Sequence, residues 1–295
     1  MIFGKISYAI QSLVKSLDGK HNFCPSCGSS NFFFFGGKSF SKFPTSLRNC
    51  QNCFLLYRFP ITLQSESLRF YELEYSQPGL TTDLPDKETL SNLLTNNFLY
   101  SEKDFSRWIP LLKRLSVVIG RKIRVIDYGA NWGYTVYQLS KLDFISECVG
   151  YEYSKVRSSF GKNKLGIKYI DEHDFNGTFD VVFSSHVIEH MYNPSIFRKH
   201  MDSLLTNNGF VVLTCPNGSL SGIVNHSNSW RKSWGKVHPN MISDLFLLKL
   251  FEGYNGSIQD DNLSDLSVNI LLDSCQTAIS SYMPTSGNLL ALIKK

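Results

Sequence analysis

Short apolar runs alternate with helical patterns over the second half of the chain. The apolar runs predict strands at residues 123–127, 147–151, 167–170, 179–184 and 210–215. Apolar residues at helical spacing predict helices between them, at residues 134–142, 154–162 and 195–205. This alternation is typical of an α/β protein with a doubly wound, mostly parallel sheet, whose ligands bind at the carboxyl ends of the strands.

The rest of the chain departs from this alternation. Residues 252–259 and 288–294 predict two more strands without a clean helix between them, as in a hairpin that closes one edge of a seven-stranded sheet. Residues 61–119 predict helices with a break at residues 78–86. Residues 1–21 predict an amphipathic helix that docks on the body of the protein; a membrane-surface role is the alternative. Its apolar residues recur at helical spacing: Ile2, Ile6, Ile10, Leu13, Val14 and Leu17.

Length, composition and charge narrow the class of protein. A chain of 295 residues predicts one main domain with an appendage, because single hydrophobic cores rarely grow larger. Hydrophobic residues make up 42% and charged residues 19%, which fits a folded soluble protein. No membrane span and no good signal peptide are found, which predicts a cytoplasmic protein. Residues 1–60 contain seven Lys or Arg and one acid, Asp18, which is weak support for a nucleic-acid partner.

Four cysteines form two C-x₂-C pairs, Cys24/Cys27 and Cys50/Cys53. Four thiolates in such pairs can close a tetrahedron around Zn²⁺, whereas disulfides are rare in a reducing cytosol. Four cysteine ligands leave no coordination position for water, so the predicted zinc is structural rather than catalytic. Residues 22–60 are therefore predicted to form a zinc ribbon.

A glycine-containing loop follows the first predicted strand of the sheet. Residues 125–133 read Val-Ile-Asp-Tyr-Gly-Ala-Asn-Trp-Gly. Gly129 allows a sharp turn beneath a ligand, and Gly133 allows the next helix to start close to the strand. Asp127 can meet polar or cationic groups of a ligand, and Asn131 tolerates positive φ better than other non-glycine residues.

Glu152 ends the next predicted strand about twenty residues after the loop, where a carboxylate can accept hydrogen bonds from both ribose hydroxyls of a cofactor. That pairing also suits a nicotinamide dinucleotide fold, but the loop lacks the complete G-x-G-x-x-G. The fourth predicted strand begins Phe-Asp-Val-Val at residues 179–182 and continues into Ile-Glu-His at residues 188–190.

These three segments, in this order, resemble the class I S-adenosylmethionine-dependent methyltransferases. The loop is similar to their D-x-G-x-x-x-G motif, and the fourth strand is similar to their F-D-h-V strand followed by Glu-His. The resemblance covers residues 120–295 and implies a Rossmann-like fold with S-adenosylmethionine as cofactor. The expected cofactor contacts are Asp127, Gly129, Asn131, Gly133, Glu152, Asp171 and His186.

The cysteine pairs, the segment from Phe70 and Tyr71 to Tyr75, and residues 237–243 resemble a subset of this family with N-terminal zinc ribbons. That subset includes sugar C-methyltransferases, in which a Glu-His pair of the late loop is implicated in proton removal. This chain has Val237 in place of the Glu, followed by His238. His238 is therefore the first candidate for a catalytic base and His190 the second, and the alternative for His238 is a local hydrogen bond beside Pro239.

The sequence from His186 to Glu189 and His190 matches two further motifs. It formally fits the H-x-x-E-H of some zinc peptidases, but that motif requires a helix and this segment begins at the end of a strand. Small-RNA 2′-O-methyltransferases use E-x-x-E-H and a later His to hold a divalent ion, and here His186 replaces the first Glu. Glu189, His190 and His238 are thus either a divalent-ion site or a hydrogen-bonded structural group.

The sequence therefore predicts an S-adenosylmethionine-dependent methyltransferase with four parts: a helix (1–21), a zinc ribbon (22–60), a helical linker or substrate lid (61–119) and a methyltransferase domain (120–295). Its expected acceptor is a small molecule, and the resemblance implies a sugar or sugar nucleotide. One alternative is an RNA or tRNA methyltransferase that docks through the basic ribbon. The missing N/D-P-P-Y/F motif disfavours that alternative, and the retained cofactor motifs disfavour the other, a non-catalytic binding module.

Overall fold

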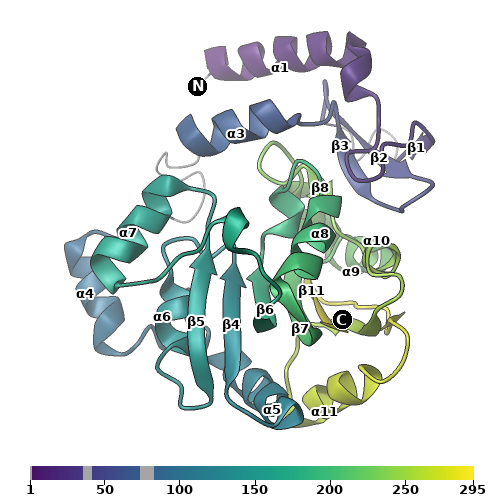
Figure 1. Cartoon of the computed structure of the whole chain (residues 1–295). Helices are drawn as coiled ribbons and strands as arrows, with labels where there is room; N and C mark the ends of the chain where they lie inside the picture. The colour runs from purple at the N-terminus through teal and green to yellow at the C-terminus, as the bar shows by residue number, and fades with distance from the viewer. Residues whose placement is uncertain (1, 36–41, 74–82) are drawn as a thin grey trace.

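The computed structural model describes residues 2–35, 42–73 and 83–295 and contains two sheets (Figure 1). The predicted segment ending at Tyr75 and the break predicted at 78–86 lie partly outside these residues. The larger sheet has seven strands in the order β10-β9-β11-β7-β6-β4-β5. They are β4 (Ile123–Tyr128), β5 (Ile145–Tyr151), β6 (Phe179–Ser185), β7 (Leu205–Pro216), β9 (Asn255–Asp260), β10 (Ser280–Ser281) and β11 (Asn288–Lys294).

The strands β5, β4, β6 and β7 are parallel to one another, as the alternating pattern predicts. They form strands because their apolar runs are buried on both faces by helices, as in other doubly wound sheets. The helices of this region are α5 (Ile109–Ile119), α6 (Tyr134–Leu139), α7 (Lys155–Leu165), α8 (Ser195–Leu204), α9 (Leu220–Ser233), α10 (Asp244–Leu250) and α11 (Asp265–Ser274). The predicted α/β fold with a mostly parallel seven-stranded sheet is confirmed.

Two details of the predicted sheet are wrong. Residues 167–170 form no strand, and only Tyr169 makes an isolated bridge with Gly150 of β5, so β10 rather than this segment supplies the seventh strand. The strands β9 and β11 do pair antiparallel, but α11 lies between them in sequence. Helix α11 covers part of one sheet face and buries Val268 and Leu271 there.

Helices cover the large sheet on both faces. Trp108, Leu111 and Leu115 of the α5 region pack with α11 against one face of β4, β6 and β7. On the opposite face, α8 and α10 supply a second set of large apolar side chains: Phe197, Met201, Leu204, Phe246 and Leu247. The sheet is thus the middle of three layers, and its carboxyl edge is the place where ligands reach it.

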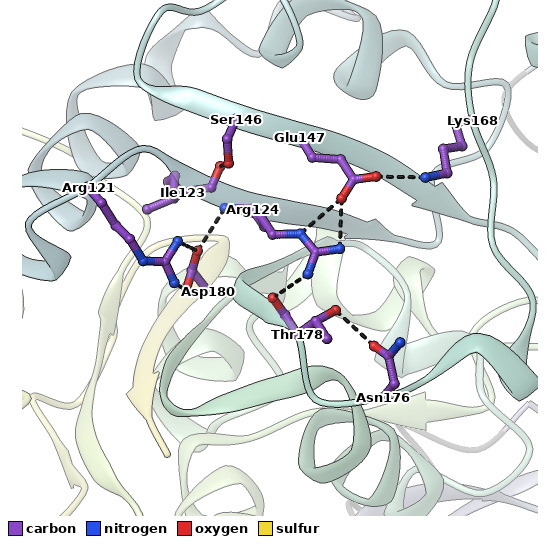
Figure 2. Close-up of polar contacts among 9 residues, drawn as sticks. All are labelled: Arg121, Ile123, Arg124, Ser146, Glu147, Lys168, Asn176, Thr178 and Asp180. Atoms are coloured by element: carbon purple, nitrogen blue, oxygen red, sulfur yellow. Dashed lines mark hydrogen bonds and ion pairs between the residues drawn. The ribbon is translucent and has the colours of Figure 1, made fainter.

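A charged network joins the first three parallel strands at their amino ends (Figure 2). Glu147 of β5 accepts hydrogen bonds from Arg124 of β4 at 2.8 and 2.9 Å and from Lys168 at 2.7 Å. Asp180 of β6 accepts two from the Arg121 guanidinium and one from the backbone N of Arg124. Asp180 is buried, so these bonds explain why an acid stands second in this apolar strand.

The smaller sheet has the order β1-β2-β3-β8, and Cys50 of the second cysteine pair ends its strand β2. Its strands are β1 (Phe32–Phe34), β2 (Ser46–Cys50), β3 (Leu56–Phe59) and β8 (Asn240–Met241). The last of these comes from the far end of the sequence and pairs antiparallel with β3. Cys24, Cys50 and Cys53 belong to the same apolar cluster as the strands of the large sheet. The region 22–60 therefore packs against the large sheet.

The first helix, α1 (Ile2–Leu17), forms as predicted but does not dock through its apolar residues. Ile6, Ile10, Leu13, Val14 and Leu17 are between 43% and 89% exposed. Polar groups face the body instead: Lys15 pairs with Glu66 of α3 (Gln64–Leu73), and Tyr8 accepts a hydrogen bond from Arg58. The helix α4 (Lys87–Thr95) begins the next described segment. Within the described ranges, no helix combines the length and apolarity needed to cross a bilayer.

Candidate functional site

A cavity of about 930 Å³ lies at the carboxyl ends of β4, β5 and β6. Several elements contribute to its wall. The strand ends contribute Tyr128, Gly129, Asn131, Glu152, Ser185 and His186; helix α3 contributes Gln64, Ser67, Leu68 and Tyr71; the segment after β6 contributes His190, the end of α9 contributes Lys232, and the loop after α9 contributes Val237 and His238. The cavity thus brings together residues from the sheet, the predicted lid region and the late loop.

Glu152 is held at the cavity wall by two backbone donors. Its Oε2 accepts from the N–H of Asn131 at 2.9 Å and its Oε1 from the N–H of Ser154 at 2.7 Å. Burial raises the pKa of Glu152, and these two hydrogen bonds and the Arg157 charge oppose the rise. A carboxylate has about four lone-pair sites, so two remain for further donors such as a pair of hydroxyl groups.

The glycine-containing loop adopts the strained turn that its sequence predicts. Asn131 has φ of +52°, and its side-chain oxygen accepts hydrogen bonds from Arg157 Nη1 at 2.6 Å and the Trp132 N–H at 2.9 Å. Gly129 has φ of +87°, and a Cβ there would lie 2.2 Å from Val187 Cγ2. Only glycine therefore fits between the end of β4 and the segment after β6.

Two of the predicted cofactor residues support this loop from behind and do not line the cavity. Gly133 begins α6 with φ of +83° and packs against Ile167 and Tyr169. Asp127 is buried, and its pKa is raised from 3.8 to about 7, mainly by this burial. The Glu152 charge also raises the pKa, whereas a hydrogen bond with Thr135 lowers it. A role of Asp127 in direct cofactor contact stays a prediction.

We expect the stability of the ligand-free protein to fall as pH rises, because of Asp127. The folded protein keeps the Asp127 proton up to about pH 7, whereas the unfolded chain releases it near 3.8, so raising the pH between these values favours unfolding. The Asp127→Asn variant lacks this titration. The free energy of unfolding of the variant and of wild type is measured with urea at pH 5 and at pH 8. The difference between the two proteins should shift by about 1–3 kcal/mol in favour of the variant over this range. Parallel pH curves for the two proteins would contradict this assignment.

Asp171 does not line the cavity, whereas its neighbour Glu172 does. Asp171 is exposed and pairs with Lys155 at 3.1 Å. Glu172 lines the cavity and accepts a hydrogen bond from Tyr151 Oη at 2.6 Å. Sequence reasoning missed Glu172, although it stands next to the predicted residue, because no strand forms at 167–170 to set which side chain faces inward.

Three histidines and one buried carboxylate meet at the other end of the cavity. Glu189 is 2% exposed, and two histidine nitrogens lie near its Oε1: His186 Nδ1 at 3.3 Å and His190 Nε2 at 4.0 Å. Neither Glu189 oxygen has a well-formed hydrogen bond within the described part of the chain. Burial opposes ionisation of Glu189, but its histidine neighbours hold its pKa below the ordinary value.

His190 and His238 are oriented by backbone carbonyls. Their Nδ1 atoms lie 2.9 Å from Val237 O and 2.8 Å from Ser233 O, which makes Nδ1 the donor and leaves each Nε2 as an acceptor. The two rings lie 4.4 Å apart at 72°. Burial lowers the pKa of His190 to about 4, so its imidazole is neutral at neutral pH. Ligand atoms of Glu189, His190 and His238 lie within 4.8 Å of one another, an arrangement that suits proton removal or a divalent ion.

The four predicted zinc ligands also meet. Cys24 Sγ lies 3.5 Å from Cys53 Sγ, and Cys27 Sγ lies 3.5 Å from Cys50 Sγ. All four sulfur atoms are within 4.8 Å of one another. A tetrahedral Zn²⁺ with Zn–S bonds of about 2.3 Å places its sulfurs roughly 3.8 Å apart, so the cluster is compatible with one zinc ion.

The family model for "Methyltransferase domain" matches residues 100–257, more than half of the chain. The chain belongs to this methyltransferase family. The match confirms the predicted enzyme class, an S-adenosylmethionine-dependent methyltransferase. Its matched region contains the loop after β4, Glu152 and the cavity histidines His186, His190 and His238, and excludes the cysteine cluster. A comparison with curated proteins finds no match.

Solved methyltransferases are similar to this methyltransferase at low sequence identity. The plantazolicin methyltransferase BpumL in complex with SAH is 17% identical with a TM-score of 0.48, over 78% of this chain and 93% of that one. The plantazolicin methyltransferase BamL is 18% identical with a TM-score of 0.49, over 77% and 94%. A SAM-dependent methyltransferase from Archaeoglobus fulgidus is 17% identical with a TM-score of 0.42, over 71% and 100%. At these values the solved structures say nothing about the acceptor of this chain.

Proposed function

We propose that the protein transfers the methyl group of S-adenosylmethionine to a small-molecule acceptor bound in the cavity at the strand ends. The observation that carries the proposal is the Glu152 carboxylate. It is fixed by two backbone N–H groups, keeps acceptor capacity, and borders a cavity that also contains Gly129 and Asn131. A ribose with two vicinal hydroxyls fits this carboxylate, and a cofactor bound over Gly129 would share the cavity with His186, His190 and His238.

The chemistry requires little from the protein beyond placement and proton removal. A sulfonium methyl group reacts by in-line attack, so the cavity must orient the acceptor and exclude water. We assign proton removal to Nε2 of His238, because His238 lines the cavity and its Nδ1 donates to Ser233 O, which leaves Nε2 of the neutral ring as the acceptor. His190, neutral and fixed by Val237 O, is the second candidate for this role.

The convergence of Glu189, His190 and His238 favours a second candidate role, a divalent ion at these three side chains. One carboxylate and two imidazoles with outward Nε2 atoms are a common ligand set for such ions, and the Glu189 oxygens lack other well-formed hydrogen bonds. An ion there would lower the pKa of an acceptor hydroxyl. In the cysteine cluster we propose a structural zinc, supported by the sulfur spacing and by four soft ligands.

The acceptor class is proposed as a sugar or sugar nucleotide, which rests on the resemblance of residues 237–243 and the cysteine pairs to sugar-modifying relatives. The alternative is an RNA or tRNA acceptor held by the basic ribbon. Mass spectrometry of ligands that co-purify with the protein separates these acceptors directly. A retained nucleoside diphosphate sugar supports the first, and a retained oligonucleotide contradicts it.

We expect Glu152→Ala to bind S-adenosylhomocysteine at least about tenfold more weakly than wild type, because it loses hydrogen bonds to a charged group worth roughly 1.5–3 kcal/mol. Calorimetric titration measures this directly. The matched control is Glu147→Ala, whose carboxylate lies at the amino edge of the sheet and should leave cofactor affinity unchanged. Equal affinity of Glu152→Ala and wild type would place the ribose elsewhere.

A further inference from the structure

A second cavity of about 390 Å³ adjoins the first between α1, α3 and residues 236–239. The two cavities share four lining residues: Ser67, Tyr71, His190 and Val237. A ligand that occupies the second cavity therefore lies next to the histidines of the first. None of the predicted cofactor residues lines this second cavity.

The second cavity is lined by an excess of positive charge. Four cationic side chains border it, Lys15, Arg58, Arg69 and Lys236, against the single carboxylate of Glu66. Glu66 is paired with Lys15 and also accepts from the Leu63 N–H at 2.9 Å. Glu66 therefore does not balance the charge of Arg58.

Arg58 is the most informative of these cations. It is 6% exposed, and its Nη1 and Nη2 donate at 2.7 Å to two neutral hydroxyls, those of Tyr8 and Thr62. Its Nε is buried and has no hydrogen-bond partner within the described part of the chain. A buried guanidinium with neutral partners is costly unless an anion offsets its charge, and its fork of donors matches the oxygens of phosphate.

We propose that this second cavity binds the phosphate or diphosphate group of the acceptor. The inference rests on the proposed function, because it places the group to be methylated beside His238 in the first cavity and its phosphate beside Arg58. The shared wall at His190 and Val237 lets one molecule reach both. A cavity enclosed by α1 and α3 suits a compact phosphorylated metabolite better than the continuous backbone of a nucleic acid.

The test is binding of inorganic pyrophosphate, measured by calorimetry at low ionic strength. Wild type should bind it, and Arg58→Met, which keeps the apolar stem, should bind at least about tenfold more weakly. The double variant Arg69→Ala/Lys236→Ala should also weaken binding, and it carries the test if Arg58→Met does not fold. Lys122→Ala is the control, because Lys122 is an exposed cation at the opposite edge of the sheet.

Titration of S-adenosylhomocysteine into the same proteins separates this inference from the proposed function. Unchanged S-adenosylhomocysteine affinity with weakened pyrophosphate binding supports the phosphate site. Pyrophosphate binding that is undetectable in wild type, or equally weakened by Lys122→Ala, overturns the site while cofactor binding still stands. An RNA oligonucleotide that binds more tightly than pyrophosphate through Arg58 overturns the small-molecule assignment. Failure of wild type to bind S-adenosylhomocysteine overturns the proposed function.

Discussion

His238→Ala should lower the rate of methyl transfer by about 10²–10⁴-fold and leave S-adenosylhomocysteine affinity nearly unchanged. The reason is that His238 lines the cavity and its Nε2 is not used by the Ser233 carbonyl, whereas the cofactor is expected to bind through Glu152. The rate is measured by methyl transfer to the acceptor identified by mass spectrometry, and the affinity by calorimetry. His173→Ala is the matched control, because His173 is exposed and outside the cavity.

Preserved activity in His238→Ala would contradict the base role and move it to His190 or to unassisted attack. The same assay decides between a base and an ion. If the rate of a zinc-containing protein depends on added Mn²⁺ or Mg²⁺, and Glu189→Gln abolishes that dependence, the divalent-ion role stands. If the rate is independent of divalent ions, the simple base role stands.

Cys50→Ser should reduce zinc content from one ion per chain to well under one and lower the free energy of unfolding by roughly 3 kcal/mol or more, since binding of a structural zinc contributes directly to folding. The loss should extend beyond the ribbon, because Cys24, Cys50 and Cys53 share an apolar cluster with the large sheet. Metal analysis and urea unfolding measure the two effects.

Cys215→Ser is the matched control for this substitution. Cys215 is as deeply buried as Cys50 but lies in β7, outside the sulfur cluster, so zinc content should not change. Unchanged zinc content and stability in Cys50→Ser would contradict a structural zinc site.

The parallel core of the fold was predictable because each strand is an apolar run with its own helix beside it. Strands β4, β5, β6 and β7 begin or end within a few residues of their predicted limits. The turn after β4 was predictable too, because positive φ favours the glycines at 129 and 133 and the asparagine at 131.

The remaining features depend on contacts between segments far apart in the sequence. Residues 167–170 have the apolar pattern of a strand but pair only through Tyr169. The apolar stripe of α1 predicts docking, yet Tyr8 and Lys15 make the contacts because their partners Arg58 and Glu66 lie beneath. Likewise, no local pattern reveals that Asn240 and Met241 extend the sheet of the cysteine region, which brings His238 to the cavity.

We expect S-adenosylmethionine to bind at the carboxyl ends of β4 and β5 through Glu152. A crystal structure of the protein with S-adenosylhomocysteine tests this most directly. Both ribose hydroxyls should lie within roughly 2.6–3.2 Å of the Glu152 carboxylate oxygens, with the sulfur atom facing the cavity end that contains His190 and His238. A cofactor bound away from Glu152, or a cavity without cofactor at saturating concentration, would contradict it.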